Sequence, residues 1–211
     1  MVKISASLLS ARDNLEKTIE EINNLDIDYI HLDIMDGKFV PNTSFTYEEI
    51  KTIISSINKP LDVHLMVKNI DEYIYDYAML NTEYITFHYE TIHNLKTIKK
   101  IKDYGIKCGI AIKPNTNVEE IFDLLPYIDL VLVMSVEPGK GGQKFIEGSE
   151  NKIRKLKDKI NSLDLHVAVS VDGGITNTTA ELCKDSGVDI LVIGSALTNN
   201  ENKIDFVNNV K

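Results

Sequence analysis

The feature of this sequence that most restricts its fold is a repeated unit, in which a short run of β-branched residues is followed by apolar residues at helical spacing. The helical spacing is clear at Leu15, Ile19, Ile22 and Leu25, and it recurs at Val118, Ile121 and Leu125, where an α-helix is expected. The strand-like runs lie at residues 4–8, 29–34, 61–67, 84–88, 107–112, 130–135, 166–171 and 190–194. Strands that alternate with helices form parallel sheets, because right-handed crossovers return the chain to the same end of the sheet.

Eight such units match the number that closes into a (β/α)8 barrel, and 211 residues lie near the short limit for that fold. An open, doubly wound sheet is the alternative, since it uses the same alternation. Only 5 prolines are spread over the chain, and no Pro/Gly/Ser-rich stretch marks a linker. We therefore expect an α/β fold in which residues 1–211 form a single (β/α)8 TIM barrel.

The charge balance excludes several classes of protein. The chain has 32 acidic and 23 basic residues, a net charge of −9, and no cluster of Lys and Arg of the kind that binds a nucleic-acid backbone. No apolar run reaches the roughly 18–20 residues that span a bilayer, the first residues lack the apolar core of a signal peptide, and two cysteines make no disulfide framework. We expect a cytoplasmic protein that binds neither nucleic acid nor membrane.

Polar residues occur late in three of the predicted strands. Period-two alternation places His31 and Asp33 on one face of their strand, His64 occupies the same face of the next, and Asp172 ends the seventh. A single strand histidine is more often a core residue and a strand-end aspartate a helix cap, but in a parallel barrel all four would meet at the catalytic end. The set predicts a site for one divalent metal ion, with Zn²⁺, Fe²⁺, Mn²⁺ and Co²⁺ as candidates.

Glycine-rich loops follow the last three strands. They contain Gly139, Lys140, Gly141 and Gly142 after the sixth strand, Gly173 and Gly174 after the seventh, and Gly194 and Ser195 after the eighth. Each could be only a tight turn, but together they favour a phosphate site made of backbone amides and the N-terminus of a helix beginning after Ser195. Such a site would let an acidic chain hold an anion without a basic surface.

Several motifs resemble those of the ribulose-phosphate 3-epimerase family, in the same order, from Ser5 to the end of the chain. They are residues 31–42 (HLDIMDGKFVPN), 62–67 (DVHLMV), 86–88 (TFH), 112–116 (IKPNT), 133–145 (VMSVEPGKGGQKF) and 171–175 (VDGGI). The resemblance implies a (β/α)8 isomerase that interconverts D-ribulose 5-phosphate and D-xylulose 5-phosphate in the pentose phosphate pathway. It also implies a homo-oligomer, either a dimer or a hexamer.

The resemblance assigns roles to particular residues. It implies that His31, Asp33, His64 and Asp172 bind the metal ion, with Asp33 and Asp172 as the acid–base pair. The implied substrate or phosphate contacts are Ser7, His64, Gly139, Lys140, Gly141, Gly142, Asp172, Gly173, Gly174, Gly194 and Ser195. An apolar cap over the site is implied for Met35, Met66 and Met134, whose alternative role is core filling.

The chemistry of epimerisation agrees with these assignments. A proton must leave the carbon beside a ketone from one face and return to the other, which needs one carboxylate on each face and a metal ion to stabilise the enediolate. Asp33 and Asp172, from distant strands, can flank such an intermediate. His88 also ends a strand on the inward face, where it could contact substrate, support a metal ligand or be a core residue.

The sequence departs from the family pattern at Ala6, Thr46-Tyr47, Lys140 and Ser170. Three other functions also fit parts of the sequence. One is an allulose-6-phosphate 3-epimerase, which would use the same mechanism. The others are a Schiff-base aldolase that uses Lys113 and a non-catalytic module that binds phosphosugars. Residues 113–116 and 139–143 favour the pentulose enzyme.

Overall fold

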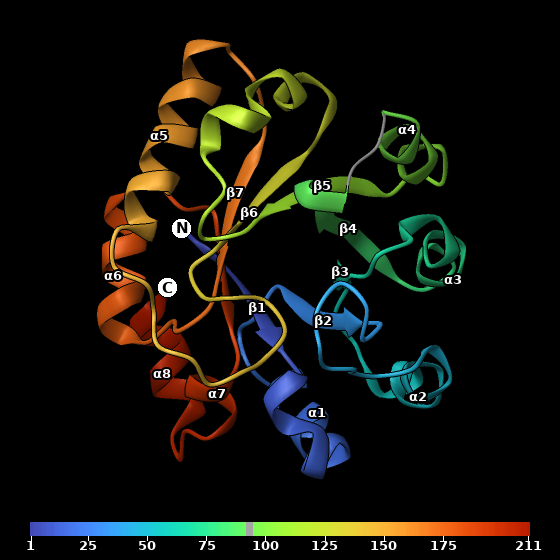
Figure 1. Ribbon diagram of the computed structural model, residues 1–211. Coiled ribbons are helices and arrows are strands. Elements are labelled where there is room, and N and C mark those ends of the chain that lie inside the picture. Colours follow the sequence, from blue (N-terminus) through green and yellow to red (C-terminus); the bar gives the residue numbers. More distant parts are fainter. Residues whose placement is uncertain (92–94) are drawn as a thin grey trace.

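The strands form a closed parallel barrel in the order β1 to β8 (Figure 1). The structure is a computed structural model that describes residues 1–91 and 95–211, apart from the side chain of Asp13. The strands are β1 (Lys3–Ser7), β2 (Tyr29–Met35), β3 (Leu61–Met66), β4 (Thr82–His88), β5 (Lys107–Ile112), β6 (Leu130–Met134), β7 (Ala168–Asp172) and β8 (Ile190–Ile193). The prediction of a (β/α)8 TIM barrel is confirmed, and the open sheet is wrong because β1 also pairs with β8.

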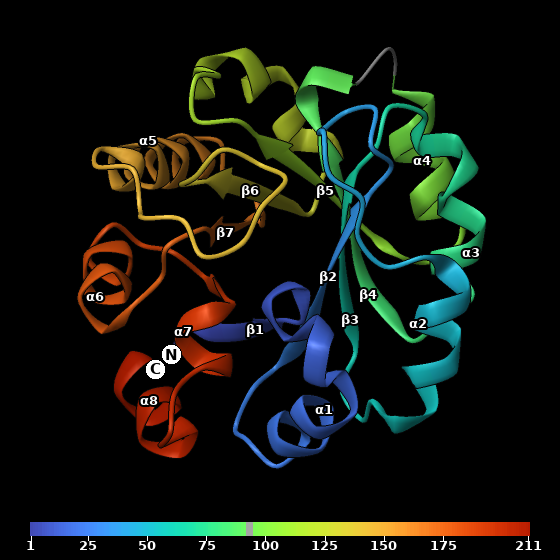
Figure 2. The same ribbon diagram turned by 60° about the horizontal axis from the view of Figure 1, so that its bottom comes forward.

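Helices surround the barrel and cover the outer face of its strands (Figure 2). The α-helices are α1 (Leu15–Asn23), α2 (Tyr47–Ile53), α3 (Ile74–Ala78), α4 (Lys96–Asp103), α5 (Ser149–Ser162), α6 (Asn177–Asp185), α7 (Ser195–Thr198) and α8 (Lys203–Val210). The 3-10 helices are η1 (Leu9–Asn14), η2 (Ile54–Ser56), η3 (Ile70–Glu72), η4 (Tyr89–Thr91) and η5 (Val118–Tyr127). No helix in these described residues is long and apolar enough to cross a membrane.

Three elements differ most from the sequence-based expectation, and one of them, β4, begins at Thr82, two residues earlier than expected. The segment that carries Val118, Ile121 and Leu125 forms the 3-10 helix η5, and Pro126 lies in its last turn, where the missing N–H opposes α-helical bonding. Strand β7 begins two residues later than expected. Its partner β6 begins at Leu130, which lies opposite Ala168, so the two residues before Ala168 have no strand residue of β6 beside them.

The strands pack differently on their two faces. Ile30, Leu32 and Ile34 of β2 point outward and are buried in the main core between sheet and helices, as their alternation predicts. Inside the barrel, a smaller apolar cluster that includes Tyr29 and Leu130 fills the lower layers. His31, Asp33, His64 and Asp172 lie on the inner face, toward the carboxyl ends of their strands.

Candidate functional site

The four predicted metal ligands come together at the carboxyl end of the barrel. Each of His31, Asp33, His64 and Asp172 offers one donor atom, and these atoms lie within 4.8 Å of one another. Strand register explains part of this, because Asp33 of β2 lies opposite His64 of β3. The Oδ1 atom of Asp33 lies 3.3 Å from Nδ1 of His64 and 3.5 Å from Nε2 of His31.

Asp172 reaches the same point from the other side of the barrel. Its Oδ2 atom lies 3.9 Å from Nδ1 of His64 and 4.0 Å from Nε2 of His31. The side chain of Asp33 is 5% exposed and that of Asp172 is 18% exposed, so both carboxylates are largely removed from water. Two acids from distant strands thus face one small polar centre.

The histidine contacts fit a divalent metal ion. Nδ1 of His31 lies 2.8 Å from Oδ2 of Asp62, which also accepts a hydrogen bond from Ser5 Oγ at 2.8 Å. Within the described part of the chain, Nε2 of His31 is buried and has no hydrogen-bond partner. One nitrogen of His31 is thus hydrogen-bonded to a carboxylate, and the other faces two further carboxylates. This arrangement is typical of a histidine that binds a metal ion.

The two carboxyls of the centre differ in proton affinity. Burial raises the pKa of Asp172 to about 6, and the neighbouring charge of Asp33 adds to this effect. Burial would also raise the pKa of Asp33, but His31 and His64 beside it outweigh burial and hold that pKa well below its usual range. Environments that separate the pKa values of two acids in this way are typical of acid–base pairs.

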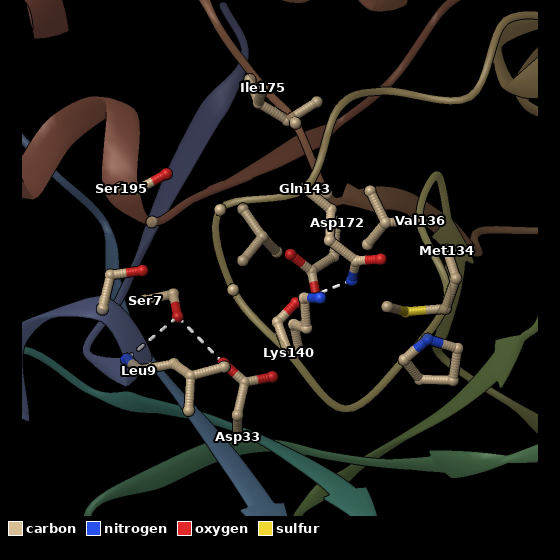
Figure 3. A pocket seen from close by; sticks show the side chains of 18 of the residues that line it. Ser7, Leu9, Asp33, Met134, Val136, Lys140, Gln143, Asp172, Ile175 and Ser195 are labelled. Atoms are coloured by element: carbon tan, nitrogen blue, oxygen red, sulfur yellow. Dashed lines mark hydrogen bonds between the residues drawn. The ribbon is translucent and has the colours of Figure 1, made fainter. Parts of the chain in front are cut away.

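A cavity of about 490 Å³ opens above this centre, with Asp33 and Asp172 in its wall (Figure 3). Ser7, for which the family resemblance implies a substrate contact, also lines it. The Oγ atom of Ser7 donates to Asp33 Oδ2 at 2.9 Å and accepts from the backbone N–H of Leu9 at 3.3 Å. The structure therefore shows that Ser7 orients a carboxylate of the centre.

The three methionines of the predicted cap line the same cavity and are buried. Met35 lies opposite Met66 across β2 and β3, and Met134 lies opposite Asp172 across β6 and β7. Their thioethers thus form an apolar wall directly beside the carboxylates.

The predicted phosphate-site residues also line this cavity. They are Gly139, Lys140, Gly141, Gly142, Gly173, Gly174, Gly194 and Ser195. Gly174 has a packing role as well: its φ is +64°, and a Cβ there would lie 2.2 Å from the backbone nitrogen of Phe145. The helix expected after Ser195 is α7, which begins at that residue and is four residues long.

His88 and Glu90 continue the chain of contacts from His64, on the side away from the cavity. Nε2 of His88 lies 3.0 Å from Nε2 of His64, and Nδ1 of His88 lies 3.1 Å from Oε2 of Glu90. Burial lowers the pKa of His88 to about 4. The sequence patterns predict no role for Asp62 or Glu90. Asp62 could have been found, because alternation places it on the same face as His64.

Three of the departures from the family pattern can be placed in the fold. Thr46 starts α2 with a capping box, in which its side chain accepts from Glu49 N–H and Glu49 accepts from Thr46 N–H. Ala6 is buried in the outer core, and Ser170 is buried on the inner face. Lys113, the lysine of the aldolase alternative, lies outside the cavity lining, with its Nζ 4.2 Å from the centre of the Phe39 ring.

Comparison with known proteins agrees with the geometry. The model of the ribulose-phosphate 3 epimerase family matches residues 3–198. The chain is 38% identical over 213 residues to a ribulose-phosphate 3-epimerase of Methanocaldococcus jannaschii, covering 100% of this chain and 90% of the relative. It is 38% identical over 202 residues to the Bacillus subtilis ribulose-phosphate 3-epimerase, covering 93% and 92%.

A solved structure with the same fold is KGPDC from Streptococcus mutans, which has a TM-score of 0.72 and 14% sequence identity. That alignment covers 100% of this chain and 95% of the other, and at this identity it supports the barrel fold alone. The sequence matches also support family membership, because they span nearly the whole chain at 38% identity. This chain belongs to the ribulose-phosphate 3-epimerase family.

Proposed function

We propose that this protein interconverts D-ribulose 5-phosphate and D-xylulose 5-phosphate by inverting the configuration at C3. The observation that carries the proposal is the pair Asp33 and Asp172, which approach one polar centre from two strands and have separated pKa values. Family membership supports the same reaction. This reaction would be a step of the pentose phosphate pathway.

The proton transfers follow from the two carboxylates. Asp33, held ionised, removes the C3 proton from one face of the ketose, and Asp172 delivers a proton to C3 from the other face. In the reverse direction the two residues exchange roles. The hydrogen bond from Ser7 holds the carboxylate of Asp33 in a fixed orientation.

His31, Asp33, His64 and Asp172 would hold the divalent ion. When bound, the ion supplies Lewis-acid stabilisation of the negative charge that develops on the substrate oxygens. Two imidazoles and two carboxylates suit Zn²⁺, Fe²⁺, Mn²⁺ or Co²⁺. The hydrogen bond between Nδ1 of His31 and Asp62 holds the His31 ring in the orientation that lets Nε2 bind the ion.

The rest of the cavity provides substrate binding. Residues of the loops after β6, β7 and β8 line the cavity, and their backbone amides would bind the phosphate there, with Lys140 adding a positive charge. Met35, Met66 and Met134 exclude water from the reacting carbon. A local amide site of this kind explains how a chain with a net charge of −9 can bind a phosphorylated sugar.

Substitution of one acid tests the proposal. Asp172→Asn should fold and retain less than about one hundredth of the wild-type turnover of ribulose 5-phosphate, since one of two proton transfers is lost. Asp123→Asn, at an exposed position of η5, is the matched control and should retain full activity. Turnover by Asp172→Asn within tenfold of wild type would remove Asp172 from the mechanism.

The substrate is tested separately. Wild-type protein should epimerise ribulose 5-phosphate with a higher kcat/KM than allulose 6-phosphate. The reverse preference would assign the same chemistry to a hexulose phosphate. A covalent adduct at Lys113, trapped with borohydride, would support the aldolase instead, although the contact of Lys113 with Phe39 disfavours it.

A further inference from the structure

His64 is the start of a hydrogen-bonded chain that leads away from the cavity. Its Nδ1 faces Asp33 at 3.3 Å, and its Nε2 faces Nε2 of His88 at 3.0 Å. The other nitrogen of His88 faces Glu90 at 3.1 Å. Both histidines are fully buried. Neither His88 nor Glu90 lines the cavity, so substrate contact does not account for this chain.

Glu90 sets the direction of the hydrogen bonds. Its Oε1 accepts from the backbone N–H of Lys113 at 3.0 Å and from the hydroxyl of Thr116, while its Oε2 faces His88. Burial alone would raise the pKa of Glu90, but these hydrogen bonds outweigh burial and lower it to about 2. An ionised carboxylate can only accept, so the proton of the bond to His88 must be on Nδ1 of His88.

The proton position on His88 then determines which nitrogen of His64, the proposed metal ligand, carries a proton. A neutral His88 with a proton on Nδ1 has a lone pair on Nε2, and that lone pair requires a donor. The donor is Nε2–H of His64. The Nδ1 atom of His64 is therefore left with its lone pair, directed toward Asp33 and Asp172. The opposite tautomer of His64 would place two lone pairs face to face at 3.0 Å.

The distal end of the chain is firmly held. Nζ of Lys152, in α5, donates to three backbone carbonyls of the loop after β5: Lys113 at 3.0 Å, Pro114 at 2.6 Å and Thr116 at 2.6 Å. The loop that supplies two donors to Glu90 is thus anchored to a helix. On its other side, the His88 ring packs against Phe39, with ring centres 4.7 Å apart.

We propose that Glu90 and His88 are positioning residues that fix His64 as its Nε2–H tautomer, so that Nδ1 is ready to bind the divalent ion. The proposal rests on the proposed metal site, and it adds the reason why His64 binds through Nδ1. The loop after β5 acts in the same chain, because its N–H and hydroxyl groups keep Glu90 a pure acceptor.

The first test requires no metal ion. Two-bond ¹H–¹⁵N correlation spectra of histidine-labelled, metal-free protein should show His88 with its proton on Nδ1 and His64 with a proton on Nε2. Spectra of His64→Gln and His88→Phe would assign the signals. A His88 that carries its proton on Nε2 in the wild-type protein would overturn the proposal, whatever the protein does with substrate.

The second test measures metal affinity by calorimetric titration with Zn²⁺ and Mn²⁺. Glu90→Gln should bind about 10–100-fold more weakly than wild type, which is the usual cost of removing a partner of a metal-bound histidine. The side-chain amide of the glutamine variant can accept a hydrogen bond only through its oxygen. Its NH₂ group must therefore face either His88 or the loop after β5, and one of these contacts is lost. Glu119→Gln, at an exposed ion pair with Lys155, loses the same charge and should bind as wild type does.

A double-mutant cycle separates this relay from a general effect of charge. His88→Phe keeps the ring volume but removes the acceptor, and it should also weaken metal binding. In that background Glu90→Gln should have no further effect, because its influence passes through His88. Equal losses from Glu90→Gln in both backgrounds, or none in either, would overturn the relay. A wild-type protein that binds no divalent ion but shows the expected tautomers would contradict the proposed function alone.

Discussion

Gly174 offers a sensitive test of how the phosphate loops are built. The residue follows β7 and has a φ of +64°, and a Cβ at this position would lie 2.2 Å from the backbone nitrogen of Phe145 and 2.8 Å from its Cα. Both neighbouring atoms belong to the backbone of the loop after β6, so no side-chain rotation can relieve the contact. Gly174→Ala must therefore move one loop relative to the other.

The size of the effect follows from this geometry. Ordinary contact begins near 3.4 Å, so the loop must shift by roughly an ångström to accept the methyl group. Left-handed backbone costs a residue with a Cβ about 1–2 kcal/mol, and overpacking adds about 1–3 kcal/mol. We expect a decrease of about 2–5 kcal/mol in the free energy of unfolding. A displacement of about 1 Å at a binding loop also lowers kcat/KM by about 100-fold.

The assay compares urea unfolding and ribulose 5-phosphate turnover with those of a matched variant. Gly105, in the turn between α4 and β5, has a φ of +77°, and apart from its two chain neighbours no atom of the described residues lies within 4 Å of a Cβ placed there. Gly105→Ala should therefore lose only the backbone term, about 1–2 kcal/mol, and keep its kcat/KM. If the two variants had the same kcat/KM within twofold, the close approach of the two loops would not matter for the site.

Three further predictions concern the metal, the thiols and pH. Removal of divalent ions with a chelator should abolish turnover, and added Zn²⁺ or Mn²⁺ should restore it; full activity after exhaustive chelation would contradict the metal site. Cys108 and Cys183 are buried, and burial raises each pKa to about 12, so a thiol reagent should modify them only on unfolding. The pKa of Glu90 is lowered from 4.5 to about 2, so its stabilisation is present above about pH 4.5 and is lost as pH falls to 2. The unfolding free energies of wild type and Glu90→Gln should therefore converge as the pH falls through this range, by less than the full pKa shift implies because Glu90 is partly exposed to solvent, and a constant difference would refute the effect.

The barrel and the metal ligands could be predicted because both depend on local periodicity. Alternation within a strand determines which side chains point inward, as for His31 and Asp33, and parallel strands bring their carboxyl ends together. The alternation of strands and helices predicts the closed sheet. These features require no knowledge of how distant loops pack.

The remaining features depend on contacts between segments far apart in the chain. Glu90 lies in η4 and acquires its role from the loop at residues 113–116, which the sequence around Glu90 does not reveal. Asp62 becomes a partner of His31 through the register of β2 and β3. The contact of Gly174 with Phe145 depends on how two loops fold over each other. The effect of Pro126 on η5 is local, so the sequence of that segment alone is enough to predict it.

The central claim is that two acids move protons on opposite faces of C3, and its most direct test is the isotope content of the product. Wild-type protein with ribulose 5-phosphate in deuterated water should form xylulose 5-phosphate that carries deuterium at C3 after a single turnover. That result is expected because the proton removed by Asp33 is not the one delivered by Asp172. Product that retains the original hydrogen at C3, or the absence of both exchange and product in metal-supplied protein, would contradict the account.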